Sequence, residues 1–315
     1  MVSCQEQVVL HVRPRKEGDK EIVWKDFQGD SFPPYSIALD GFVAGPPAID
    51  YQKPCVNLNH HEGVVGFATR ATCEQTRVAL DMGLFKTLMR KDGRPYAHVF
   101  VDDCDQDVCL SWYELSRYPH LKGPLLTRLV QVQGLLDMSA GSYEFDPDAP
   151  ILREFAWIFE PYVEARMSGR LFTMASQEMQ RVIELVCARI DAYMLGNGQK
   201  LSLDDEYEVL RSGTGWKLVR MKGYYARLKM RTDGIMTYVS YRGETSEGNV
   251  ICSIGAEPFV PARLPELFDR LSAAEPDGRK WGGRDTIGAT PKRIGSALSI
   301  DIICEIVERH MKSSL

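Results

Sequence analysis

Three short apolar segments in the first half of the chain end directly at acidic or histidine side chains. Residues 36–43 read SIALDGFV, residues 54–58 end at a histidine pair, and residues 96–101 read YAHVFV and end at an acidic run. Apolar runs of this length are typical of buried strands. The carboxyl ends of parallel strands meet at one edge of an α/β sheet, where ligands bind. The pattern therefore predicts a parallel α/β domain with a polar site at that edge.

Helical and strand-like periodicities divide the chain into three parts. Residues 1–150 alternate apolar strands with a helical segment at 71–89, which predicts the α/β domain. Residues 151–204 have apolar positions at helical spacing and predict a helical connector. From residue 205 the pattern alternates in part, at 218–230 among other places, and we expect residues 205–315 to form a smaller α+β domain.

The composition bounds the class of protein. The chain has 315 residues, of which 44% are hydrophobic and 26% charged, with a net charge of −5. These values are typical of a globular protein and give no general attraction to polyanions. The eight cysteines form no CxxC pair, which argues against a cysteine zinc site. Since no signal-like start and no apolar run near about 18 residues occurs, we expect a cytoplasmic protein without a membrane partner.

Acidic and histidine side chains gather after the three apolar segments and after residues 127–136. Four carboxylates lie within six residues at 102–107, and two histidines are adjacent at 60–61. Burying like charges together is costly unless a cation compensates, and a divalent metal is the simplest one. Solvated acidic loops and helix caps remain the alternatives. The candidates for metal binding or catalysis are Asp40, His60, His61, Asp103, Asp105, Asp107 and Asp137.

Residues 281–296 form a glycine-rich basic segment. Glycines allow a close approach of the backbone to a ligand, and exposed N–H groups can hold anions. Basic and hydroxyl side chains in the same segment favour phosphate binding, although a plain flexible loop is the alternative. The candidates for substrate binding are Gly282, Gly283, Arg284, Thr290, Lys292, Arg293 and Ser296.

These motifs resemble those of the DHH family of phosphoesterases. Residues 59–61, Asn-His-His, resemble the Asp-His-His signature, and residues 105–111 resemble the family's D-x-D step that enters a helix with a serine. Residues 135–137 resemble the segment with the late aspartate of the metal site. The pair at 282–283 is similar to the glycine-rich substrate loop of the family's C-terminal domain.

The resemblance implies a hydrolase that uses one or two Mn²⁺ or Mg²⁺ ions. Its substrate would be a phosphodiester or phosphoanhydride, in a nucleotide or short oligonucleotide, bound between two domains. His61 would face the scissile phosphate, and the basic residues of segment 281–296 would hold the rest of the substrate. The resemblance leaves homo-oligomerisation open. The metal ligands that it implies are Asp40, His60, Asp105, Asp107 and Asp137.

Two departures from the family pattern keep other functions open. Asn59 stands where the signature has aspartate, and the D-x-D step follows the histidine pair instead of preceding it. One alternative is a regulatory protein that binds nucleotide or nucleic acid without cleaving it. Another is a metal-dependent hydrolase of an amide or C–N bond, for which histidine and carboxylate ligands also serve.

Overall fold

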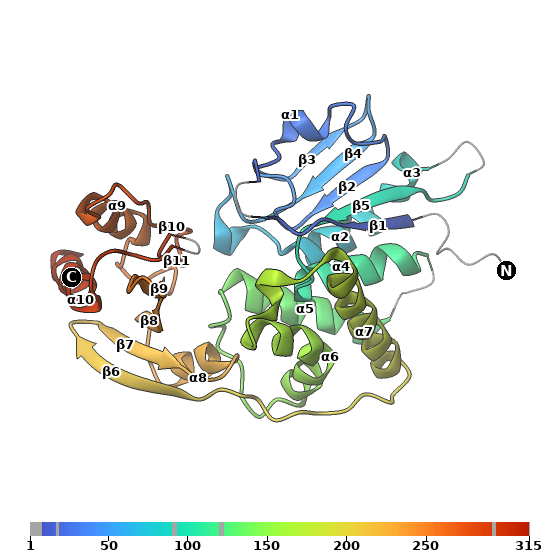
Figure 1. Cartoon of the computed structure of the whole chain (residues 1–315). Coiled ribbons are helices and arrows are strands. Elements are labelled where there is room, and N and C mark those ends of the chain that lie inside the picture. Colours follow the sequence, from blue (N-terminus) through green and yellow to red (C-terminus); the bar gives the residue numbers. More distant parts are fainter. Residues whose placement is uncertain (1–7, 17–18, 90–92, 120–122, 292–293, 315) are drawn as a thin grey trace. The chain divides into compact units, whose positions relative to one another are not determined.

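The computed structural model describes residues 8–16, 19–89, 93–119, 123–291 and 294–314 (Figure 1). The chain divides into two compact units. Unit 1 comprises Met1–Met138 and Pro150–Ser202, and unit 2 comprises Ser139–Ala149 and Leu203–Leu315. These bounds differ from the three parts expected from the sequence: the helical residues after Pro150 belong to unit 1 and form no separate body.

Unit 1 contains the parallel sheet that the sequence predicts. In the described residues its strand order is β1-β5-β2-β4-β3, and every neighbouring pair is parallel except β3 with β4. β2 and β4 are fully buried, which explains why most of their residues are apolar. The α/β class is thereby confirmed. The strands are β1 (Val8–Val12), β2 (Ser36–Leu39), β3 (Ala48–Asp50), β4 (Cys55–Leu58) and β5 (Ala97–Val101).

Helices lie on both sides of this sheet (Figure 1). The short α1 packs its phenylalanine against one side, and α2, α4 and α7 lie on the other. The single helix expected at 71–89 is two helices, because Gly83 has a φ of 95° and interrupts it. The helices are α1 (Trp24–Phe27), α2 (Thr72–Asp81), α3 (Leu84–Thr87), α4 (Gln106–Arg117), α5 (Pro124–Met138), α6 (Pro150–Met167) and α7 (Ser176–Met194).

Unit 2 is built on a mostly antiparallel sheet, as expected for an α+β domain. Its described strands run in the order β10-β11-β9-β8-β7-β6, and only β7 and β8 pair in parallel. The strands are β6 (Tyr207–Gly213), β7 (Trp216–Met221), β8 (Thr237–Glu244), β9 (Val250–Ala256), β10 (Gly282–Gly283) and β11 (Ile287–Ala289).

Helices α8 (Ala226–Thr232), α9 (Leu264–Ala274) and α10 (Ile300–Ser314) complete unit 2. The largest core of this unit joins the sheet to α9 and α10 through buried side chains such as Ile254 and Val307. The expectation of a strand-like segment at 218–230 is wrong in its second half, which is α8. The alternation of apolar and polar residues does not mark a strand there, because the chain leaves β7 at a tight turn before α8.

The turn between β7 and α8 depends on a glycine. A Cβ atom at Gly223 would lie 2.1 Å from the backbone oxygen of Asp204, so a side chain does not fit without movement of the backbone. The amide nitrogen of Gly223 also donates to Glu206 at 3.0 Å. The strand therefore ends where two backbone segments approach closely at Gly223. The alternating pattern of the sequence does not predict this end.

One carboxylate joins α10 to the β6–β7 turn. Glu308 accepts hydrogen bonds from the backbone N–H of Thr214 at 2.9 Å, from its hydroxyl at 2.7 Å, and from Nε1 of Trp216 at 2.7 Å. These donors, with the ammonium of Lys312, lower the pKa of Glu308 to about 2. The ionised carboxylate therefore fixes the position of the helix on the sheet.

We expect Glu308→Gln to lower the melting temperature at neutral pH. Because the pKa is lower in the folded state than its ordinary value of 4.5, the stabilisation is present above that value. It is lost as the pH falls towards 2. Calorimetry from pH 7 to pH 2 should show a difference between the two proteins that disappears at low pH. Glu305→Gln, on the same helix, is the control, and a difference that persists at pH 2 would contradict this assignment.

Candidate metal centre

The turn after β2 brings Asp40 to the carboxyl edge of the first sheet. Asp40 has a φ of 52° and Gly41 a φ of 84°, so both residues adopt the left-handed conformation. Such a backbone is uncommon for a non-glycine residue, and functional sites are among the places where it clusters. A Cβ atom at position 41 would lie 3.2 Å from Cδ2 of His61. The glycine thus leaves room for this imidazole beside Asp40.

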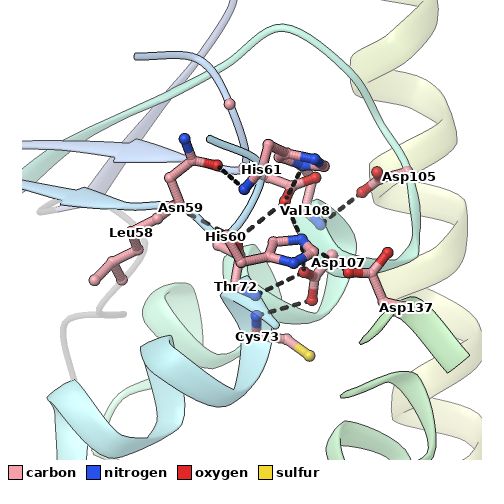
Figure 2. A network of polar contacts seen from close by, with 12 residues as sticks. Leu58, Asn59, His60, His61, Thr72, Cys73, Asp105, Asp107, Val108 and Asp137 are labelled. Carbon is pink, nitrogen blue, oxygen red and sulfur yellow. Dashed lines mark hydrogen bonds and ion pairs between the residues drawn. The ribbon is translucent and has the colours of Figure 1, made fainter. Parts of the chain in front are cut away.

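His60 lies at the centre of the carboxylates (Figure 2). Its Nε2 atom is 2.8 Å from Oδ2 of Asp137, 3.2 Å from Oδ1 of Asp40 and 3.6 Å from Oδ2 of Asp107. The side chain of His60 is completely buried. Three carboxylates from three separate elements, a strand end and the helices α4 and α5, therefore meet around one imidazole.

Two overlapping groups of side chains have the spacing of a metal site. In one group Asp40, His60 and His61 converge, and in the other His60, Asp107 and Asp137 converge. Within each group the potential ligand atoms lie within 4.8 Å of one another. His61 is the more accessible histidine, with 35% of its side chain exposed, and its Nε2 lies 2.9 Å from Asp40 Oδ1.

Asp107 is held by the first turn of a neighbouring helix. Its Oδ2 accepts the backbone N–H of Thr72 at 2.7 Å, and its Oδ1 accepts that of Cys73 at 2.8 Å (Figure 2). Both amides belong to the N-terminus of α2, where backbone N–H groups lack partners within the helix and favour a negative charge. A carboxylate of α4 thus caps α2, which fixes Asp107 beside His60.

The shifts in pKa at the site follow from burial and from its concentration of carboxylates. Burial lowers the pKa of His60, but Asp137 and Asp40 outweigh it and raise that pKa to about 11. Burial raises the pKa of Asp40, yet the charges and hydrogen bonds of the two histidines bring it well below its ordinary value. Burial, with the charges of Asp40 and Asp137, raises the pKa of Asp107 to about 7. The carboxylates therefore create a potential that stabilises a cation at this point.

The remaining acids of the run 102–107 lie outside both groups. Asp105 Oδ1 accepts the N–H of Val108 at 2.9 Å and so forms the N-cap of α4. Asp103 Oδ1 accepts the N–H of Cys104 at 2.6 Å. Burial raises the pKa values of both aspartates. The structure thus gives Asp105 a capping contact beside the site and brings neither residue into the converging ligand sets.

Asp102, the first acid of the run, forms an ion pair with Arg15. Arg15 Nε lies 2.6 Å from its Oδ2, and the guanidinium also donates to the backbone oxygens of Gly41 and Phe42. Burial raises the pKa of Asp102 to about 6, although Arg15 opposes the shift. Arg15 therefore supports the Asp40–Gly41 turn and joins it to the end of β5.

Two contributors to the site have no motif in the sequence. Thr72, the first residue of α2, donates through Oγ1 to Asp40 Oδ1 at 2.9 Å. Arg166, in the last turn of α6, donates to the hydroxyl of Tyr162 at 2.6 Å, and its charge partly opposes the rise that burial causes in the pKa of Asp103. A hydroxyl at the start of the helix that follows the histidine pair was a usable signal for Thr72. Nothing in the sequence pattern indicates Arg166.

The residues predicted to bind substrate lie in unit 2, and their described members have structural contacts. Gly282 and Gly283 form β10 and pair with β11. The Thr290 hydroxyl donates to the backbone oxygen of Cys252 at 3.3 Å, and the buried Ser296 hydroxyl donates to Glu275. The backbone N–H of Arg284 donates to Ile287 at 2.7 Å. The other two predicted residues, Lys292 and Arg293, lie outside the described residues.

Comparison with models of known families, with curated proteins and with solved structures gives no match. Among the helices that the structure describes, none is long and apolar enough to cross a membrane. The resemblance to the DHH family therefore rests on the sequence motifs alone.

We expect Asp105 to act in the folded protein as a helix cap. Asp105→Ala removes the acceptor for the Val108 N–H and should destabilise the protein by about 1 kcal/mol. Asp105→Asn should retain most of that stability, because asparagine caps helices as well as aspartate does. Urea unfolding of the two variants measures the difference. Equal destabilisation by both substitutions would show that the negative charge, and not the cap, is what α4 needs.

Proposed function

We propose that this protein is a metal-dependent phosphoesterase that hydrolyses a phosphodiester or phosphoanhydride in a nucleotide or short oligonucleotide. The observation that carries the proposal is the meeting of Asp40, Asp107 and Asp137 around His60, with His61 beside them. Carboxylates and imidazoles at one buried point are the ligand types of two-metal and one-metal phosphoesterases.

The ligand types fit Mn²⁺, with Mg²⁺ as the second choice. Carboxylate oxygens suit both ions, whereas an imidazole nitrogen in the shared position of both groups favours the transition metal. A bound cation of this kind supplies a water of lowered pKa and positive charge next to the phosphoryl oxygens. Asp40, His60, Asp107 and Asp137 are the residues that would hold it.

His61 is the residue that we assign to the substrate. Its side chain is 35% exposed whereas that of His60 is buried, and Asp40 orients its ring at 2.9 Å. The Asn59 side chain also accepts the backbone N–H of His61 at 3.0 Å. A partly exposed imidazole that Asp40 orients, on a backbone that Asn59 holds, can donate a hydrogen bond to a phosphoryl or leaving-group oxygen. Arg166 adds positive charge on the side of Asp103.

A row of small residues in unit 2 supports a role in substrate binding. Ser240 pairs with Ser253, Ser253 pairs with Ala289, and Ala289 pairs with Gly282, so the four residues lie side by side across four strands. The hydroxyls of both serines are buried and have no hydrogen-bond partner among the described residues. Unsatisfied buried hydroxyls in a row of small residues are suited to receive polar groups of a ligand.

A nucleotide-binding protein without catalysis is the second candidate, and Asn59 is the observation that favours it. Its amide nitrogen donates to the backbone oxygens of Gly45 at 2.8 Å and Val43 at 3.2 Å. An ionised aspartate has no donor for these carbonyls. Asn59 is therefore used to hold the loop after β2, and it brings no negative charge to the site.

Hydrolysis of a generic phosphodiester, bis(p-nitrophenyl) phosphate, in the presence of Mn²⁺ tests the proposal. Asp107→Asn and Asp40→Asn each weaken a proposed ligand and should lower kcat/KM more than about 100-fold, since both carboxylates would act on the bound cation. Glu62→Gln is the control, because this exposed carboxylate follows the histidine pair yet lies outside both ligand groups.

Two other outcomes separate the alternatives. A wild-type protein that binds Mn²⁺ and nucleotide but hydrolyses neither phosphodiesters nor phosphoanhydrides would favour the regulatory candidate. Full activity in the Asp40→Asn, Asp107→Asn double variant would contradict the proposal, because hydrolysis would then not depend on the residues that converge on His60.

A further inference from the structure

We infer that Thr72 is a positioning residue that fixes two of the proposed metal ligands relative to each other. The inference rests on the proposed function, because it concerns the geometry of the same metal centre. Thr72 is the first residue of α2 and is completely buried. It contacts carboxylates that come from two different parts of the chain, and it does so through two different donors.

The two donors of Thr72 reach two acids. Its hydroxyl donates to Asp40 Oδ1 at 2.9 Å, and its backbone N–H donates to Asp107 Oδ2 at 2.7 Å (Figure 2). Asp40 follows β2 and Asp107 lies in α4, and these residues are 67 positions apart in the sequence. A single residue thus sets the separation of two ligands that no local segment could hold together.

The two contacts differ in how they respond to substitution. The bond to Asp107 comes from the backbone, and Asp107 has a second backbone bond from Cys73 at 2.8 Å. Any residue at position 72 except proline retains it. The bond to Asp40 comes from the side chain, and only a residue with a hydroxyl donor retains it in full strength. Loss of the hydroxyl therefore removes the bond to Asp40 and a longer contact, 3.5 Å, to the backbone oxygen of Leu58, and leaves the bond to Asp107 in place.

The hydroxyl matters because the other neighbours of Asp40 Oδ1 are the two histidines. His60 lies at 3.2 Å and His61 at 2.9 Å from this oxygen. His60 is a proposed metal ligand and His61 is assigned to the substrate, so the positions of both imidazoles respond to what the site binds. Thr72, by contrast, is not a proposed metal ligand. Its hydroxyl donates to this oxygen from the first turn of α2. It orients the carboxylate before a cation arrives, as hydrogen bonds to metal ligands generally do.

The chain offers a matched control on the same helix. Thr76 lies one turn after Thr72, is also completely buried, and its hydroxyl has no hydrogen-bond partner among the described residues. Thr76→Val makes the same chemical change in the same helix without touching Asp40. Loss of metal affinity through a general disturbance of α2 would appear in both variants, whereas loss of the Asp40 contact would appear only at position 72.

Isothermal titration of the full chain with Mn²⁺ tests the inference. We expect Thr72→Val to weaken Mn²⁺ binding about 10- to 100-fold, the usual effect of losing a hydrogen bond to a metal ligand. Thr72→Ser should restore binding to within about threefold of the wild type, because serine provides the same donor. Thr76→Val should bind as the wild type does. Thermal unfolding without metal, measured on each variant, shows whether the fold is retained.

The outcomes distinguish failure of the inference from failure of the proposed function. A wild-type protein that does not bind Mn²⁺ removes the metal centre and the inference together. Normal binding by Thr72→Val, or equal weakening in Thr72→Val and Thr76→Val, overturns the role of Thr72 and leaves the metal centre intact. If the valine variant does not fold, Thr72→Cys replaces it, since a thiol is a weak donor of similar size. Binding equal to that of Thr72→Ser would then overturn the inference.

Discussion

The contact on which the site depends is the burial of one imidazole among three carboxylates. Three negative charges would repel one another strongly in a water-excluded environment, so the arrangement persists only with positive charge at its centre. In the folded chain that charge is the His60 ring, whose pKa is raised to about 11 by Asp137 and Asp40 against the effect of burial. A divalent ion bound there would replace a proton on His60, and the ring would then act as a ligand.

The architecture of unit 1 explains how the acids are held together despite their repulsion. Asp40 is fixed by the left-handed turn after β2, and Asp107 is fixed by the N-terminal amides of α2. The backbone geometry thus holds both acids in place, and their attraction to His60 adds to that hold. Apolar packing of the sheet and helices stabilises the fold in which these charges meet.

The sequence predicted the sheet and the location of the polar edge because strand ends are visible in it. Buried parallel strands read as apolar runs; Asp40 directly follows β2, and His60 follows β4 after one residue, Asn59. It did not separate Asp107, which joins the cluster, from Asp105, which caps α4, because the direction of each side chain depends on where that helix begins. Nor did it show that Asn59 serves a loop, since its partners are backbone carbonyls without a residue pattern.

The residue pattern at 281–296 distinguishes ligand binding from packing less clearly than the strand ends of the first half do. Glycine, hydroxyl and basic residues at 281–296 are typical of anion loops, but they are equally useful where strands pair closely. A Cβ atom at Gly288 would lie 2.3 Å from Phe268 Cζ, so this glycine is required by the packing of α9 on β11. Composition alone does not separate these uses. In the same sheet, the Ser240 and Ser253 hydroxyls are buried and have no hydrogen-bond partner among the described residues, which is costly in a folded core.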